Sequence, residues 1–260
     1  MKRFIENIKR YFKYAVYSAR ADLKAEVAGS YLNWLWWVLD PMFFMMIYIF
    51  IAGVVFKTTE PYFPVFIFTG LTVWDYFNRN INASVKIVSA NRAIVTKIYI
   101  PKYILVLQKS FVTFFKMLIS WGLVVILMIL WKVPLTINIL YFIPILIVLY
   151  LITFGLSLIL THFGIFVEDL GNVVALGLRL VFYLSGIFYN IGTRIPSPFN
   201  RILLHCNPVA FIINSFRDTL LYGKAPSLLV LGGWFIIGLL FTMIGIHIIH
   251  KYENSYAKVI

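Results

Sequence analysis

The sequence contains little cysteine and little charge. Cys206 is the only cysteine among 260 residues, so the chain forms no internal disulfide, and a thiolate metal site is not expected. Charged residues make up 13% of the chain and hydrophobic residues 62%. In an average soluble domain, about 25% of the residues are charged and about 45–50% are apolar. This balance excludes an ordinary soluble enzyme, a disordered chain and a secreted disulfide scaffold. It indicates an all-helical membrane protein with several spans.

Motifs for catalysis and metal binding are also missing. No segment follows the G-x-x-x-x-G-K-[ST] pattern of a phosphate-binding loop, so this chain alone is not expected to hydrolyse ATP. The four histidines are scattered, and no metal site is expected. Glu168 and Asp169 form the only adjacent acidic pair. A membrane-embedded glycolipid transferase would need a nucleophile, an acidic pair or a metal, and it remains the alternative from a different functional class.

Long hydrophobic runs dominate the rest of the chain. A helix needs about 20 mostly apolar residues to cross the roughly 30 Å hydrocarbon core. The sequence predicts six such spans, at residues 34–56, 62–78, 111–131, 137–160, 170–191 and 228–249. Asp40, beside Pro41, is expected to cap the first of them.

Basic residues predict the orientation of the spans. Lys and Arg number 23 and Asp and Glu 10, giving a net charge of +13. In a membrane protein such an excess marks cytoplasmic loops and anionic headgroups rather than nucleic acid. The amino-terminal segment, the loop after the second span and the tail carry most of the bases. Both termini of this multi-pass membrane protein are therefore expected in the cytoplasm.

Three segments outside the spans stand out in a chain that forms one transmembrane domain over residues 1–260. Residues 1–32 are basic and amphipathic, which is typical of a helix lying on the membrane surface. Residues 84–101 form a long basic cytoplasmic loop. Residues 192–227 form an external segment in which Asn207 and Pro208 predict the start of a helix over 209–221. Its apolar residues recur at helical spacing with Arg217 and Asp218 opposite, so a re-entrant or interfacial helix is expected.

Several sequence blocks occur in a fixed order. Residues 21–41 lead from a basic segment through tryptophans to a proline, and a glycine–tryptophan block spans residues 70–77. The later blocks are residues 91–101, residues 166–170, residues 207–217, and Glu253 with Tyr256. Together the blocks resemble those of ABC-2 type export permeases. Within that family, the pattern is similar to the permeases that export lipid-linked polysaccharides such as O antigen, capsule or teichoic acid. One departure is Glu168, where the family often has a basic residue.

The resemblance implies partners rather than cofactors. It implies a homodimer of this chain bound to two copies of a separate ATPase subunit, with ATP and Mg on that subunit and no cofactor on this chain. A lipid-linked polysaccharide is the implied substrate, and membrane lipids rather than nucleic acid surround the protein. Permeases for drugs or lipids in the wider family are the second possibility.

Two groups of site residues follow. Aromatic and basic side chains on spans one, three and five are candidates for a channel, because aromatic rings stack on the C–H faces of sugars: Trp34, Trp37, Lys116, Arg179, Tyr183 and Tyr189. The alternatives are an aromatic belt or core packing for the rings, and snorkelling or pairing for the bases. The residues expected to couple to the ATPase mix exposed bases with apolar side chains: Arg92, Ile94, Val95, Lys97, Ile98 and Tyr99. Glu168 and Asp169 are assigned to a cytoplasmic gate.

Overall fold

The computed structural model describes residues 2–29, 31–51, 53 and 60–259. Over these residues the chain is helical, and the described part contains no β-strand. In chain order the helices are α1 (Lys2–Val27), η1 (Asn33–Leu35), α2 (Trp36–Phe50), α3 (Phe63–Ala90), α4 (Arg92–Val95), α5 (Lys102–Leu130), η3 (Ile137–Tyr141), α6 (Phe142–Phe166), α7 (Leu170–Leu184), α8 (Ile191–Arg194), α9 (Phe199–Cys206), α10 (Pro208–Leu220) and α11 (Leu228–Val259).

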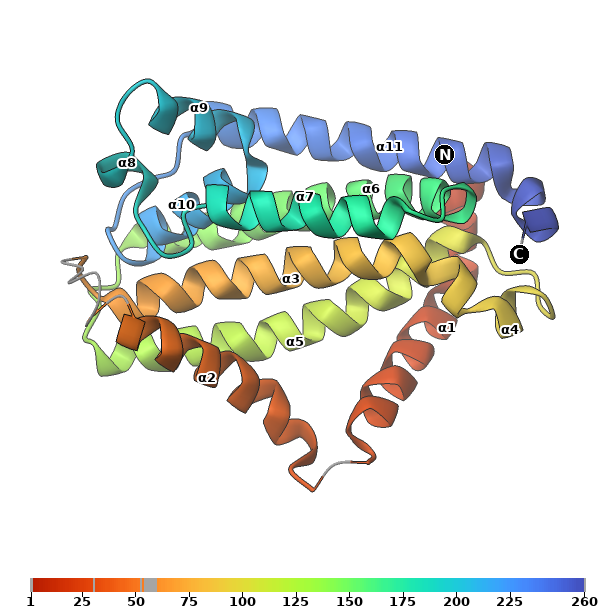
Figure 1. Cartoon of the computed structure of the whole chain (residues 1–260), viewed down its shortest axis with the longest axis horizontal. Coiled ribbons are helices and arrows are strands. Elements are labelled where there is room, and N and C mark those ends of the chain that lie inside the picture. Colours follow the sequence, from red (N-terminus) through yellow and green to blue (C-terminus); the bar gives the residue numbers. More distant parts are fainter. Residues whose placement is uncertain (1, 30, 52, 54–59, 260) are drawn as a thin grey trace.

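The long helices run side by side along one axis (Figure 1). α3 packs against α5 and α6, and α6 packs against α11. Gly155 allows α6 and α11 to approach closely, since a Cβ at this position would lie 2.7 Å from the Cβ of Phe241. Small residues are used in this way at helix interfaces in membranes.

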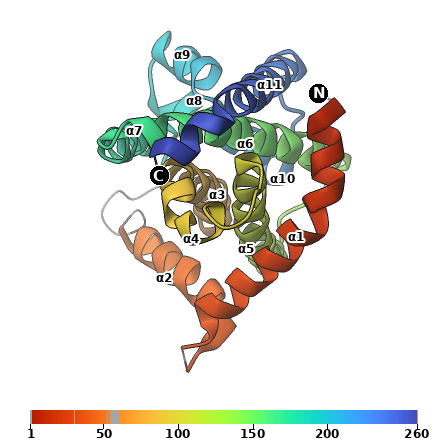
Figure 2. The ribbon, with the colours of Figure 1, turned by 90° about the vertical axis from the view of Figure 1, so that its right-hand side faces the viewer.

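The two ends of the bundle differ. α1 begins and α11 ends at the same end of the molecule as α4, whereas α8, α9 and α10 lie at the opposite end (Figure 1). Figure 2 shows α1 and α2 as the two arms of a V that projects from the bundle on the side away from α11.

Three helical segments in the described part are long and apolar enough to cross a membrane, namely Lys102–Leu130, Ile137–Phe166 and Leu228–Glu253. α2 and α7 are apolar but have only 15 residues each, or about 22 Å of helix. α3 has 28 residues but carries charged side chains along its length. The all-helical membrane class is confirmed, and the count of six spans stays a prediction. The fifth predicted span, 170–191, ends as a helix at Leu184, and residues 52 and 54–56 of the first lie outside the described residues.

The external segment forms the helix that its sequence predicts. The side chain of Asn207 accepts hydrogen bonds from the backbone N–H groups of Val209 (3.0 Å) and Ala210 (3.2 Å), which caps α10 at its first turn. One expectation is wrong. Arg217 does not lie on an exposed polar face of this helix, because it is buried with 3% of its surface exposed.

Candidate functional site

A cavity of about 590 Å³ separates α2 from the helices of the bundle. It lies inside the V between α1 and α2. Six aromatic and five charged side chains share its wall with smaller residues; the lining consists of Glu26, Val27, Trp36, Trp37, Asp40, Pro41, Phe44, Tyr48, Leu71, Thr72, Trp74, Asp75, Asn78, Arg79, Lys116, Ser120 and Phe182. A concave, mostly apolar wall with a few polar groups is typical of a ligand-binding site.

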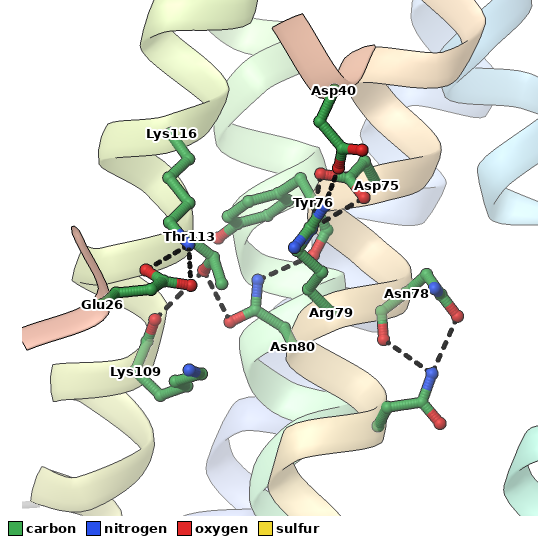
Figure 3. A network of polar contacts seen from close by, with 11 residues as sticks. Glu26, Asp40, Asp75, Tyr76, Asn78, Arg79, Asn80, Lys109, Thr113 and Lys116 are labelled. Carbon is green, nitrogen blue, oxygen red and sulfur yellow. Dashed lines mark hydrogen bonds and ion pairs between the residues drawn. The ribbon is translucent and has the colours of Figure 1, made fainter. Parts of the chain in front are cut away.

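An ion pair joins the end of α1 to α5 at this cavity. The Lys116 Nζ lies 2.5 Å from the carboxylate of Glu26 (Figure 3). It also lies 5.6 Å from the centre of the Trp37 ring. The Lys116 side chain is 14% exposed. The carboxylate of Glu26 therefore compensates the charge of Lys116, and the channel role of this lysine stays a prediction.

A second ionic group joins α2 to α3. The Arg79 Nε donates to both carboxylate oxygens of Asp75 at 2.7 Å, and its Nη2 lies 3.7 Å from Asp40 (Figure 3). The expected capping role of Asp40 is wrong, because α2 begins at Trp36 and places Asp40 inside the helix. Instead, Asp40 faces an arginine on the neighbouring helix across the cavity.

Buried polar contacts fix α3 to α5 beneath these charges. The Asn80 Nδ2 donates to the Tyr76 carbonyl at 2.7 Å, and the Thr113 hydroxyl donates to the Asn80 Oδ1 at 2.9 Å (Figure 3). The Tyr76 and Ser110 hydroxyls are 3.3 Å apart. Hydrogen bonds between helices in an apolar medium hold two faces in one register. The wall formed by α3 and α5 is thus a fixed surface.

Aromatic rings form the remaining wall. The Trp74 and Phe182 rings lie 5.2 Å apart, which joins α3 to α7, and Trp37 meets Phe115 edge to face at 6.0 Å. Aromatic faces bind the C–H faces of sugar rings, and carboxylates accept hydrogen bonds from sugar hydroxyls. Three acids and two already paired bases give no surplus positive charge for an anion. The chemistry favoured by this wall is non-covalent binding of a polar, uncharged group.

The structure brings together only part of the predicted channel set. Trp37 and Lys116 line the cavity, whereas Trp34 lies exposed in η1 outside it. Arg179 and Tyr183 lie on the exposed side of α7, and the Tyr189 hydroxyl donates to the Tyr183 carbonyl at 2.8 Å.

The sequence interpretation missed several lining residues. Trp74, Asp75 and Arg79 belong to the cavity but were not predicted as site residues. A signal existed for two of them, because Asp75 and Arg79 are four residues apart, the spacing at which opposite charges pair on one helix face.

The predicted coupling residues lie on α4 and the turn after it. Ile98 and Tyr99 are exposed, as are Arg92 and Lys97. Ile94 and Val95, by contrast, are partly buried against the apolar cluster at this end of the bundle. The side chains of Ile94 and Ile98 therefore differ in exposure. Their backbones remain close, since the Ile98 N–H donates to the Ile94 carbonyl at 2.9 Å.

The coupling loop is bonded to the end of α11. The Tyr99 hydroxyl donates to the buried carboxylate of Glu253 at 2.9 Å. One turn further on, the Tyr256 hydroxyl lies 2.8 Å from the His162 Nδ1 at the end of α6, and burial raises the pKa of Tyr256. Sequence reasoning grouped Glu253 with Tyr256 as a tail block but did not connect them to Tyr99.

The two acidic residues assigned to a gate lie in the turn between α6 and α7. Glu168 and Asp169 are both exposed there. Within the part of the chain that the structure describes, no three His, Cys, Asp or Glu side chains gather as a metal site would require. Cys206 is exposed on α9.

Relatives of known name cover nearly the whole chain. An O-antigen export system permease protein, RfbA, of Klebsiella pneumoniae is 29% identical over 255 residues, which are 98% of this chain and 97% of that protein. A second K. pneumoniae protein of the same name is 28% identical over 259 residues, with the same coverage. An RfbA protein of Myxococcus xanthus is 24% identical over 227 residues, or 87% of each chain.

No family model matches the chain. The full-length relatives nevertheless agree with the resemblance that the sequence blocks carry. The similarity to permeases of polysaccharide export is therefore confirmed, from one end of the chain to the other.

Proposed function

We propose that this chain is the transmembrane permease subunit of an ATP-driven exporter that moves a lipid-linked polysaccharide across the bacterial cytoplasmic membrane. The single observation that carries the proposal is the similarity to O-antigen export permeases over 98% of the chain. A drug exporter or a glycolipid transferase is not favoured, because the relatives that match end to end are named as export permeases.

The proposed topology has six spans with both termini in the cytoplasm. α1 and α11 have their chain ends beside α4 (Figure 1). The segments that meet at this end carry most of the basic residues, and the positive-inside rule assigns it to the cytoplasm. α10, at the other end, then acts as a re-entrant helix at the outer mouth. α2 and α7 have only 15 residues each and would end within the hydrocarbon core. They can serve as spans if protein rather than lipid surrounds their ends.

The channel is proposed to form between two copies of the chain. α7 exposes Val173, Leu176, Leu180 and Tyr183 together with Arg179. An arginine within a span is costly when it faces lipid, which favours a partner subunit or a water-filled path beside this face of α7. The cavity inside the V supplies aromatic rings and carboxylates for the glycan, while Arg179, Tyr183 and Tyr189 belong to the part that the second copy completes.

Energy is proposed to come from two ATPase subunits that carry ATP and Mg. The surface offered to them is Arg92 on α4 and, in the turn after it, Lys97, Ile98 and the ring of Tyr99. Glu168 and Asp169 lie in the turn that joins α6 to α7. They are proposed as the cytoplasmic gate.

Reconstitution tests this function. The chain and its ATPase are placed in liposomes, and ATP hydrolysis and movement of a lipid-linked O antigen into the lumen are measured. We expect both to require the two subunits together, with hydrolysis stimulated by the glycolipid and not by the lipid carrier without its glycan. Transport or glycolipid chemistry by this chain alone would contradict the proposal.

A further inference from the structure

Arg217 on α10 is buried and bonded to backbone carbonyls from two other parts of the fold. Its Nε and Nη2 donate to the Phe66 carbonyl at 3.1 and 3.0 Å, and the guanidinium carbon lies 3.4 Å from the centre of the Phe66 ring. Its Nη1 donates to the Gly186 carbonyl and its Nη2 to the Ile187 carbonyl, both at 2.7 Å. One side chain therefore joins α10, the first turns of α3 and the turn that follows α7.

The carbonyls that Arg217 meets, those of Gly186 and Ile187, lie in the turn just past Leu184, the last residue of α7. The last carbonyls of a helix lack partners within the helix and carry a partial negative charge. Because α7 stops after 15 residues, these groups are not carried to the membrane surface. The side-chain amide of Asn207 donates to the Leu184 carbonyl at 3.4 Å and to the Ser185 hydroxyl at 3.2 Å. Asn207, the residue that caps α10, thus bonds the last residue of α7, and Arg217 on α10 bonds the turn that follows it.

The α3 side of this contact is shaped for the guanidinium. A Cβ at Gly70 would lie 2.7 Å from the Arg217 Nη2 and 3.4 Å from the Ile187 Cγ2. A larger residue at position 70 would displace the guanidinium from its acceptors without removing its charge. The glycine of the glycine–tryptophan block therefore has a specific physical role, which is to admit Arg217.

We infer that Arg217 is a positioning residue for export: it locks α10, the helix at the outer mouth, to the end of α7, so that the two move as one body. The inference rests on the proposed function. Without this lock, a displacement of α7 would not be passed to α10. ATP would then be hydrolysed by the assembled complex with less polysaccharide exported per ATP.

The first arm of the test needs neither substrate nor nucleotide. In a Cys206→Ala background, Ser185→Cys places a thiol at a buried site (1% exposed) beside Asn207. Reaction with a water-soluble maleimide is expected to be slow with Arg217 present. Arg217→Gln should speed it roughly tenfold or more, because the α7–α10 contact then opens locally. Arg201→Gln, at an exposed arginine on α9, is the matched control and should leave the rate unchanged.

The second arm measures coupling in the complex reconstituted with its ATPase and a lipid-linked O antigen. Arg217→Gln should lower the polysaccharide exported per ATP roughly tenfold, since small misplacements of a working element have effects of this size. Arg217→Lys should recover part of the ratio. Gly70→Ala provides a second variant that keeps the guanidinium, and it should lower the ratio in the same direction even if Arg217→Gln does not assemble.

The outcomes are distinguishable. Unchanged labelling in both Arg217→Gln and Gly70→Ala overturns the lock. A purely structural role also overturns the inference, and it predicts that complex yield, hydrolysis and export fall together with an unchanged ratio. If the unmodified complex exports no polysaccharide, the proposed function fails, while the labelling arm still reports on the lock by itself.

Discussion

Lys116 on α5 and Glu26 at the end of α1 are 90 residues apart in the sequence and form an ion pair of 2.5 Å above the Trp37 ring. The pair joins the V of α1 and α2 to the bundle at the rim of the cavity. With the Arg79–Asp40 contact on the other side, it sets how far α2 stands from α3 and α5.

Reversing the charge at Lys116 should weaken this attachment. Lys116→Glu places two carboxylates together, whereas Glu26→Lys combined with Lys116→Glu restores opposite charges. A thermal double-mutant cycle on the purified protein, with Lys116→Glu, Glu26→Lys and the double variant, should give a coupling of about 1 kcal/mol or less, because Glu26 is half-exposed. Additive effects of the two single changes would show that the pair contributes nothing to stability.

Replacing a cavity tryptophan should impair substrate recognition. Trp37→Leu removes an aromatic wall, and we expect the glycolipid concentration that gives half-maximal stimulation of ATP hydrolysis to rise roughly tenfold, equivalent to about 1.4 kcal/mol of lost binding. Trp131→Leu serves as the control, because Trp131 is exposed at the end of α5 and lies outside the cavity. Equal losses in both variants would remove the cavity from the glycan path.

The two isoleucines of the coupling loop should behave differently. Ile98 is 60% exposed, so Ile98→Asp should abolish most ATPase copurification while the chain still accumulates in the membrane. Ile94 packs against the apolar cluster, so Ile94→Asp should reduce the amount of folded chain itself. Normal copurification with Ile98→Asp would exclude this surface from the interface.

The six-span topology predicts that the external segment begins and ends on one side. Ser197 and Ser227 are both exposed. In a Cys206→Ala background, Ser197→Cys and Ser227→Cys should each label from outside intact cells with a membrane-impermeant maleimide. Labelling of one site only after permeabilisation would mean that α10 spans the membrane.

Local sequence signals predicted local structure well. Composition predicted a helical membrane protein, and Asn207 with Pro208 predicted the start of α10, because a cap depends on residues within one turn. Helix ends were less predictable. The hydrophobic run 170–191 continues past Leu184, yet Gly186 adopts a positive φ and ends the helix there.

The sequence by itself determined the class of protein, the basic loop between α3 and α5 and the similarity to polysaccharide export permeases, since composition, charge and block order are properties of the chain. Only the tertiary structure decided which charges are compensated. Arg217 bonds to Phe66 across 151 residues, and Lys116 meets Glu26 across 90. Helical periodicity indicates which face a side chain lies on, but not which distant carbonyl or carboxylate that face will meet. For the same reason the cavity, built from α1, α2, α3, α5 and α7, appears only when these helices are packed together.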